Sequence, residues 1–198
     1  MKITHLSTFV VTTQKTMPFT DLSGHWAAEA ITYVYGNGLM NGTSDTTFAP
    51  DESLNRAMLA TILYRLSGEP AARGEGKTFM DVAPDTWYTS AVAWASANGI
   101  VSGVGDGKFA PTQAITREEL ATMLYRYAKY SKLDTSAKGD LSKFADGDQS
   151  AAWASDAMAW AVGAGLISGK TANVIDPTGT ATRAEVATIL MRFTELTK

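Results

Sequence analysis

The sequence contains no cysteine among its 198 residues, and it contains only two histidines. Without cysteine, disulfides, thiolate metal sites and a cysteine nucleophile are excluded. His5 and His25 have no counterparts in the internal repeats of the chain, so we expect neither a histidine-centred triad nor a zinc site. These absences argue against an enzyme and predict that the chain uses no cofactor.

The chain also lacks an excess of positive charge and any long apolar run. Its net charge is −3 and its pI is near 5.4, which gives no basic surface for nucleic acid. No apolar stretch approaches the roughly 18 residues of a membrane span, so we expect no membrane insertion. Residues 1–18 lack the apolar centre and cleavage site of a signal peptide. We interpret them as a tail or upstream linker, which suggests a piece of a longer protein.

One segment occurs three times along the chain. Its copies are aligned by an arginine at the same position in each: Arg56, Arg117 and Arg183. In the second copy, Thr116 followed by Glu119 forms a capping box, and the apolar residues after it have the three-four spacing of an amphipathic helix. The third copy repeats this box, whereas the first copy has Asn55 as the cap and Met58 in place of the glutamate. Each copy therefore predicts a helix that begins at the arginine.

A cation in the first turn faces the positive end of the helix dipole, where acidic side chains are normally preferred. Three copies of this unfavourable choice suggest a use. Free N–H groups at a helix start, beside a guanidinium, could hold a carboxylate or phosphate. The alternative is that each arginine pairs with a nearby acid such as Glu118, or with an interdomain aspartate. On the anion-site hypothesis, we expect replacement of the arginine by alanine to leave stability unchanged or slightly raised.

Each copy opens with an aromatic residue and an aspartate, and a tryptophan follows. The aspartates are Asp21, Asp81 and Asp146, and the tryptophans are Trp26, Trp87 and Trp153. An aspartate just before a helix most often caps backbone N–H groups. A tryptophan at a helix start is typical of a core, although its ring could also flank a sugar.

A first helix in each copy is predicted to end at a glycine, with a second glycine four residues later. The first glycines, Gly38, Gly99 and Gly165, fit the left-handed position that ends a helix. The second glycines are Gly42, Gly103 and Gly169. They allow close approach of either a packed neighbour or a ligand. Polar connectors separate the copies, which predicts repeats at residues 19–70, 79–130 and 144–198.

The set of Phe-x-Asp, Trp, Gly-x-x-x-Gly, Asp106-Gly107-Lys108-Phe109-Ala110-Pro111 and Ile115-Thr116-Arg117-Glu118-Glu119 resembles the S-layer homology motif. The resemblance implies a mainly α fold, in which three tandem helix-loop-helix repeats form one pseudo-threefold, monomeric unit with a central three-helix core. It also implies an extracellular role at the cell wall or S-layer of Gram-positive bacteria and some relatives. There the grooves between motifs bind a secondary cell-wall polysaccharide with pyruvate ketals on N-acetylmannosamine.

Carried over by position, the resemblance implies roles for nine residues. The arginines Arg56, Arg117 and Arg183 would contact the pyruvyl carboxylate, the second glycines would permit sugar approach, and the aspartates would orient or cap the groove. The tryptophans complete the expected ligand-binding set. Because the second copy keeps the most complete motif, we expect Arg117 to contribute most to binding, Arg183 next and Arg56 least.

The sequence is also compatible with two other classes of function. A glycosidase would need two carboxylates roughly 5–10 Å apart in a cleft, and catalysis seldom needs three copies of one site. A structural spacer or protein-interaction module would also use repeats. It would not explain three arginines that oppose three helix dipoles.

Overall fold

The computed structural model describes residues 17–71 and 76–196, and the first sixteen residues of the expected tail lie outside these ranges. Each of the three repeats contributes two α-helices in chain order, and two 3₁₀ turns precede the fifth α-helix. They are α1 (Ala28–Gly36), α2 (Arg56–Leu66), α3 (Thr89–Ala97), α4 (Arg117–Tyr130), η1 (Leu141–Lys143), η2 (Gly147–Gln149), α5 (Ser155–Gly163) and α6 (Arg183–Glu195). Within the described ranges, β structure is limited to isolated bridges. The mainly helical prediction is confirmed.

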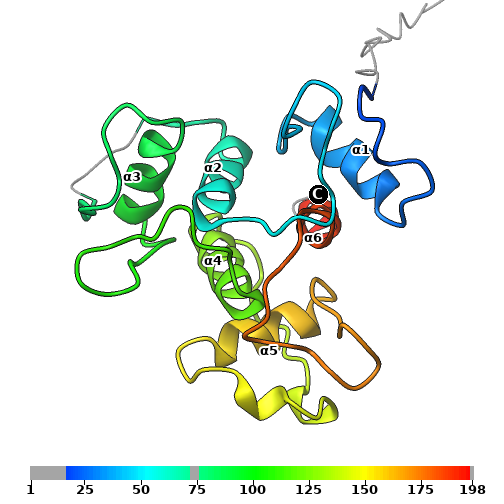
Figure 1. The fold of residues 1–198 in the computed structure, drawn as a ribbon. Helices are drawn as coiled ribbons and strands as arrows, with labels where there is room; N and C mark the ends of the chain where they lie inside the picture. The colour runs from blue at the N-terminus through cyan, green and yellow to red at the C-terminus, as the bar shows by residue number, and fades with distance from the viewer. Residues whose placement is uncertain (1–16, 72–75, 197–198) are drawn as a thin grey trace, which may run out of the picture.

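The second helix of each repeat lies near the centre of the molecule, and the first helix lies outside it (Figure 1). The outer helices do not pack on the central helix of their own repeat. Instead α3 packs on α2, α5 on α4, and α1 on α6. The outer helices have only nine residues each, and isolated helices of this length are unstable in water. Each repeat therefore depends on its neighbours, and the last repeat closes the ring with the first.

The three segments that lead into the central helices α2, α4 and α6 meet in a triangle of backbone hydrogen bonds. The N–H of Leu54 donates to Ala181 O at 2.9 Å, that of Ala181 to Ile115 O at 3.1 Å, and that of Ile115 to Leu54 O at 2.9 Å. All three residues are fully buried. Further along the central helices, Tyr127 of α4 packs against Phe193 of α6 with ring centroids 5.7 Å apart. This is the expected three-helix core about a pseudo-threefold axis.

The predicted helix ends are confirmed. Thr116 and Glu119 form a reciprocal capping box at the start of α4, and the equivalent pair does so in α6. In α2 the side chain of Asn55 accepts from the N–H of Met58 at 2.8 Å. The glycines that follow the outer helices have left-handed φ angles, which are 69° at Gly38, 68° at Gly99 and 70° at Gly165. A residue with a Cβ would be strained there.

Among the described residues, no helix combines the length and apolar character needed to cross a membrane. In the same ranges, no group of three or more His, Asp or Glu side chains is arranged to hold a metal ion.

Candidate functional site

The three repeated arginines are almost fully buried, with 3 to 6% of their surface exposed. The Nε of each donates to a backbone carbonyl in the loop of the next repeat. The bonds run from Arg56 to Phe109 O (2.9 Å), from Arg117 to Ile175 O (2.8 Å) and from Arg183 to Phe48 O (2.8 Å). Burial is the main influence on the pKa of Arg117 and lowers it, although an arginine remains charged at any physiological pH. The arginines thus tie the repeats together.

The N–H groups at the starts of the central helices are occupied by the neighbouring repeat. At α4, the N–H of Arg117 donates to Gly179 O and that of Glu118 to Pro177 O, both at 2.9 Å. The N–H of Glu119 donates to its cap, Thr116 Oγ1, at 3.2 Å. The helix starts of α2 and α6 are occupied in the same way. The prediction that free N–H groups at these helix starts form an anion site is therefore wrong, and the side chains of the arginines remain as candidates.

The repeated aspartates hold the loop that receives the arginine. Asp146 accepts from the N–H groups of Ile175 and Asp176 at 2.8 and 2.7 Å. The Ile175 N–H is the main reason that the pKa of Asp146 lies below its ordinary value. Asp176 has a left-handed φ of 55°, a conformation that costs free energy for a residue with a Cβ. Asp21 and Asp81 make the same pair of bonds in their own repeats, so their structural role is to cap the loop.

The second glycines are required by packing. A Cβ at Gly103 would lie 2.9 Å from Cε1 of Phe79 and still closer to the carbonyl oxygen of Lys108. The same aromatic position, Phe19 or Phe144, and a loop carbonyl crowd Gly42 and Gly169. Of the two uses expected for these glycines, the packed neighbour is therefore present in all three repeats. The same glycines also line three surface pockets.

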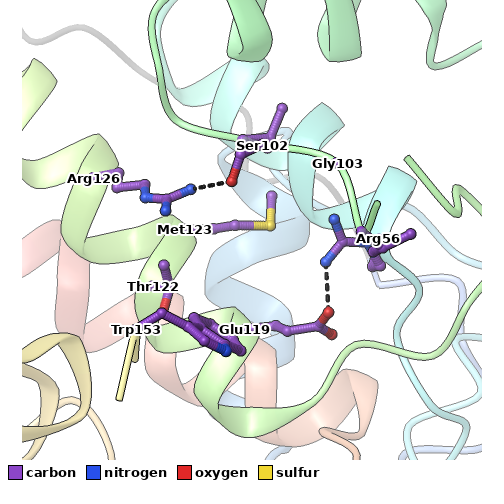
Figure 2. Close-up of a pocket in the computed structure, with 10 residues that line it drawn as sticks. Arg56, Ser102, Gly103, Glu119, Thr122, Met123, Arg126 and Trp153 are labelled. Carbon is purple, nitrogen blue, oxygen red and sulfur yellow. Dashed lines mark hydrogen bonds and ion pairs between the residues drawn. The ribbon is translucent and has the colours of Figure 1, made fainter. Parts of the chain in front are cut away.

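Each of these pockets is assembled from all three repeats. We name them by the central helix that lines them. The α4 pocket combines Gly103, Thr122 and Arg126 of the second repeat with Arg56 of the first and Trp153 of the third. Figure 2 shows this arrangement, in which Arg126 and Arg56 lie on opposite sides of the pocket and Trp153 lies at its edge.

The α2 and α6 pockets are lined by the equivalent residues, with the three repeats exchanging places. The α2 pocket is lined by Gly42, Thr61, Arg65, Arg183 and Trp87, and the α6 pocket by Gly169, Thr188, Arg192, Arg117 and Trp26. The α4, α2 and α6 pockets have volumes of about 380, 190 and 250 Å³. Pockets for drug-sized ligands span roughly 300–1,000 Å³, so these would accommodate small groups or a short part of a polymer.

The expected order of the arginines' contributions to binding was based on how complete the motif of each arginine's own repeat is, and this geometry does not support that order. Arg117 belongs to the most complete repeat, yet it lines the pocket built on α6 of the next repeat. Each arginine must therefore be judged by the pocket that it enters.

The three predicted tryptophans are exposed at the pockets. Trp26, Trp87 and Trp153 have 64%, 60% and 58% of their surface accessible to solvent. Trp94 and Trp160, on the outer helices α3 and α5, are only 1% exposed and belong to the core. An exposed indole offers an apolar face and one N–H, which suits the apolar face of a sugar ring. Of the two interpretations of the repeated tryptophans, the surface position agrees with the sugar-facing one.

Sequence reasoning missed two further residues of each pocket. Arg65, Arg126 and Arg192 are partly buried in the central helices, and Thr61, Thr122 and Thr188 lie near them on the same helices. The Nη1 of Arg126 donates to Ser102 Oγ at 2.9 Å (Figure 2). The signal was present in the sequence, because each of these residues recurs at a constant distance from the first arginine of its repeat.

Comparison with known proteins gives three matches to the model of the S-layer homology domain, at residues 18–58, 78–121 and 143–187. The chain is 32% identical over 187 residues to the exoglucanase XynX of Acetivibrio thermocellus, covering 92% of this chain and 17% of the relative. It is 34% identical over 180 residues to a surface-layer 125 kDa protein of Lysinibacillus sphaericus, covering 89% and 15% of the two chains. An amylopullulanase of Thermoanaerobacterium thermosulfurigenes matches at 32% identity over 89% of this chain and 9% of its own length. The chain thus spans less than a fifth of the length of these relatives.

Proposed function

Because this chain belongs to the S-layer homology domain family, whose members are cell-surface anchoring modules, we propose that it attaches a larger protein non-covalently to the cell wall by binding a wall polysaccharide in its three pockets. The observation that carries the proposal is the composition of the pockets. Each combines an exposed tryptophan with two arginines, and the three residues come from three different repeats. We propose residues 19–70, 79–130 and 144–198 as the repeats of one monomeric, pseudo-trimeric domain.

The arginines favour a polysaccharide that carries carboxylate groups. A guanidinium presents several N–H donors in a fixed plane, and these match the oxygens of a carboxylate. The pyruvate ketal on N-acetylmannosamine, which the resemblance implies, has such a carboxylate beside an apolar methyl group. In this proposal Arg56, Arg117 and Arg183 contact the carboxylate and the tryptophans Trp26, Trp87 and Trp153 contact sugar rings. Gly42, Gly103 and Gly169 shape the pocket floor, and Asp21, Asp81 and Asp146 keep the adjoining loops in place.

The pockets favour binding over glycoside hydrolysis. Hydrolysis by the common mechanism needs a pair of carboxyl groups that flank the scissile bond. Among the described lining residues, the α4 pocket has Glu119, the α6 pocket has Glu185 and the α2 pocket has no acid. Relatives named exoglucanase and amylopullulanase suggest that the anchored partner of such a module can be an enzyme carried elsewhere in the same protein.

The proposal is tested by sedimentation of the chain with purified Gram-positive cell walls before and after extraction of their secondary polysaccharide. A third sample carries the polysaccharide after mild acid has cleaved its pyruvate ketals. We expect the chain to pellet with intact walls, to remain in solution with extracted walls, and to bind weakly to the acid-treated ones. Equal binding to extracted walls, or no binding to intact walls, would contradict the proposal. Release of reducing sugar from the walls by the chain would contradict the non-catalytic part.

A further inference from the structure

The three pockets are related by the repeats, but they differ at the third residue of the central helix. This position is Glu119 in α4, Glu185 in α6 and Met58 in α2. In each pocket it faces the buried arginine that enters from another repeat. The residue at this position therefore decides whether that arginine already has an anionic partner.

In the α4 and α6 pockets the partner is a carboxylate of the chain itself. Glu119 Oε1 accepts from Arg56 Nη1 at 2.7 Å (Figure 2). Glu185 Oε1 lies 3.9 Å from Arg117 Nη1 and 3.0 Å from Lys170 Nζ. A bound anion would have to share these donors with the glutamate and to tolerate a like charge close by, which costs free energy in a partly buried site.

In the α2 pocket, the one hydrogen-bond acceptor that Arg183 Nη1 meets among residues 17–71 and 76–196 is the thioether sulfur of Met58, at 3.9 Å. Sulfur of this kind is a weak acceptor. Two bonds to backbone carbonyl oxygens hold the guanidinium of Arg183 in place: Nε donates to Phe48 O at 2.8 Å and Nη2 donates to Asn41 O at 2.7 Å. Arg183 is 4% exposed. Arg183 Nη1 is thus a strong donor held in place at the pocket, and it has no strong acceptor among the residues that the structure describes.

The charges around this pocket also favour an anion. Arg65 lines it together with Arg183, and no acidic side chain is among its described lining residues. Burial lowers the pKa of Arg183, and two acids outside the lining, Glu52 and Asp21, oppose this effect. Trp87 and Met58 supply apolar surface beside the two cations.

We propose that the three pockets are unequal, and that the α2 pocket is the primary carboxylate site because Met58 stands where the other pockets have glutamate. This inference rests on the proposed function and adds the position of the tightest contact. The ligand carboxylate accepts from Arg183 Nη1 and from Arg65, while its sugar ring lies against Trp87. The α4 and α6 pockets contribute weaker contacts to the same polymer.

The test is titration calorimetry with soluble wall-polysaccharide fragments that bear carboxylates, and with the same fragments after reduction of the carboxyl groups to alcohols. The variants are Met58→Glu and, as the uncharged control of similar size, Met58→Gln. Met58→Glu places in α2 the glutamate that completes the capping boxes of α4 and α6, three residues after the existing N-cap Asn55, so we expect the variant to fold. Thermal melts of both variants verify this.

We expect Met58→Glu to weaken the tightest binding of carboxylated fragments by about tenfold to a hundredfold, which corresponds to one charge-assisted hydrogen bond. Met58→Gln should weaken this binding by clearly less, within about tenfold, because its amide oxygen can accept from Arg183 Nη1 but carries no negative charge. Reduced fragments should bind the parent and both variants alike. If Met58→Glu binds carboxylated fragments as tightly as the parent, or loses affinity equally for reduced fragments, the inference is wrong and the proposed function stands. If the parent binds neither fragment, the proposed function itself fails.

Discussion

Arg117 of α4 donates through Nη2 to the carbonyl oxygen of Ser168 at 2.6 Å, and so joins the second repeat to the third. Its Nε makes a second bond to Ile175 O. Arginine at this position is therefore part of the connection between repeats, whatever it binds in addition.

We predict that Arg117→Ala lowers the free energy of unfolding by about 1.5–3 kcal/mol, because the buried carbonyl group of Ile175 and the partly buried one of Ser168 lose a charged donor. This replaces the expectation that the change leaves stability unchanged. Urea melts of the variant and the parent measure it. Arg126→Ala is the matched control, since Arg126 is half-buried and bonds to an exposed serine side chain; it should cost less than about 1 kcal/mol. Equal melting of Arg117→Ala and the parent would refute the structural role.

The difference between the expected and the observed surroundings of Arg117 shows which features the sequence could predict and which it could not. The caps Thr116 and Thr182, the glycines after the outer helices and the amphipathic stripes depend on neighbours within a few residues, so they were predicted correctly. The carbonyls that occupy the N–H groups of Arg117 and Glu118 come from Gly179 and Pro177 in another repeat. Nothing local to the arginine reveals that pairing.

The same limit applies to the pockets. The tryptophans and the first arginines were recognised because they recur, but their grouping into pockets that each draw on three repeats depends on the closed ring of helices. Arg65, Arg126 and Arg192 recur equally well, yet an arginine late in a helix is favourable in the helix dipole. The position of these three arginines in the sequence therefore gave no reason to expect that they line a pocket.

We predict that Gly103→Ala destabilises the protein by about 1–3 kcal/mol, the usual range for added volume in a well-packed region. The new methyl group would overlap the carbonyl of Lys108 and the ring of Phe79. The control is Gly36→Ala at the end of α1, where nothing lies within 4 Å of the added Cβ. It should be neutral, or stabilising by up to about 1 kcal/mol. Thermal melts that place both variants at the parent's midpoint would contradict the packing argument.

The loop aspartates predict a sensitivity of the fold to acid. Partial burial raises the pKa of Asp81, but the N–H groups of Phe109 and Ala110 outweigh it and hold the pKa below its ordinary value. A lowered pKa in the folded state stabilises the protein fully above the unfolded pKa of about 3.9, and this contribution is lost as the pH falls through the folded pKa.

We therefore predict that Asp81→Asn is less stable than the parent at pH 7, and that this difference shrinks below about pH 4. Urea melts at a series of pH values compare the two proteins. A difference in stability that stays constant down to pH 2 would show that the ionised carboxylate is not the source of the stabilisation.

We predict that residues 19–68 do not fold on their own. This fragment contains α1 and α2 but lacks α6 and α3, on which they pack. Its circular dichroism should show little helix and no cooperative thermal transition, because helices this short need tertiary contacts. A helical monomer with a cooperative melt would contradict the interlocked arrangement of the repeats.

The central claim, that wall polysaccharide binds in the three composite pockets, is tested most directly by fluorine NMR of the chain labelled with 5-fluorotryptophan. The five tryptophans give five signals, each assigned by a Trp→Phe variant. On titration with soluble wall-polysaccharide fragments, we expect the signals of Trp26, Trp87 and Trp153 to shift, with Trp87 responding at the lowest concentration, while those of the buried Trp94 and Trp160 stay in place. Binding that leaves the three exposed tryptophans unchanged would place the polysaccharide outside these pockets and contradict the account.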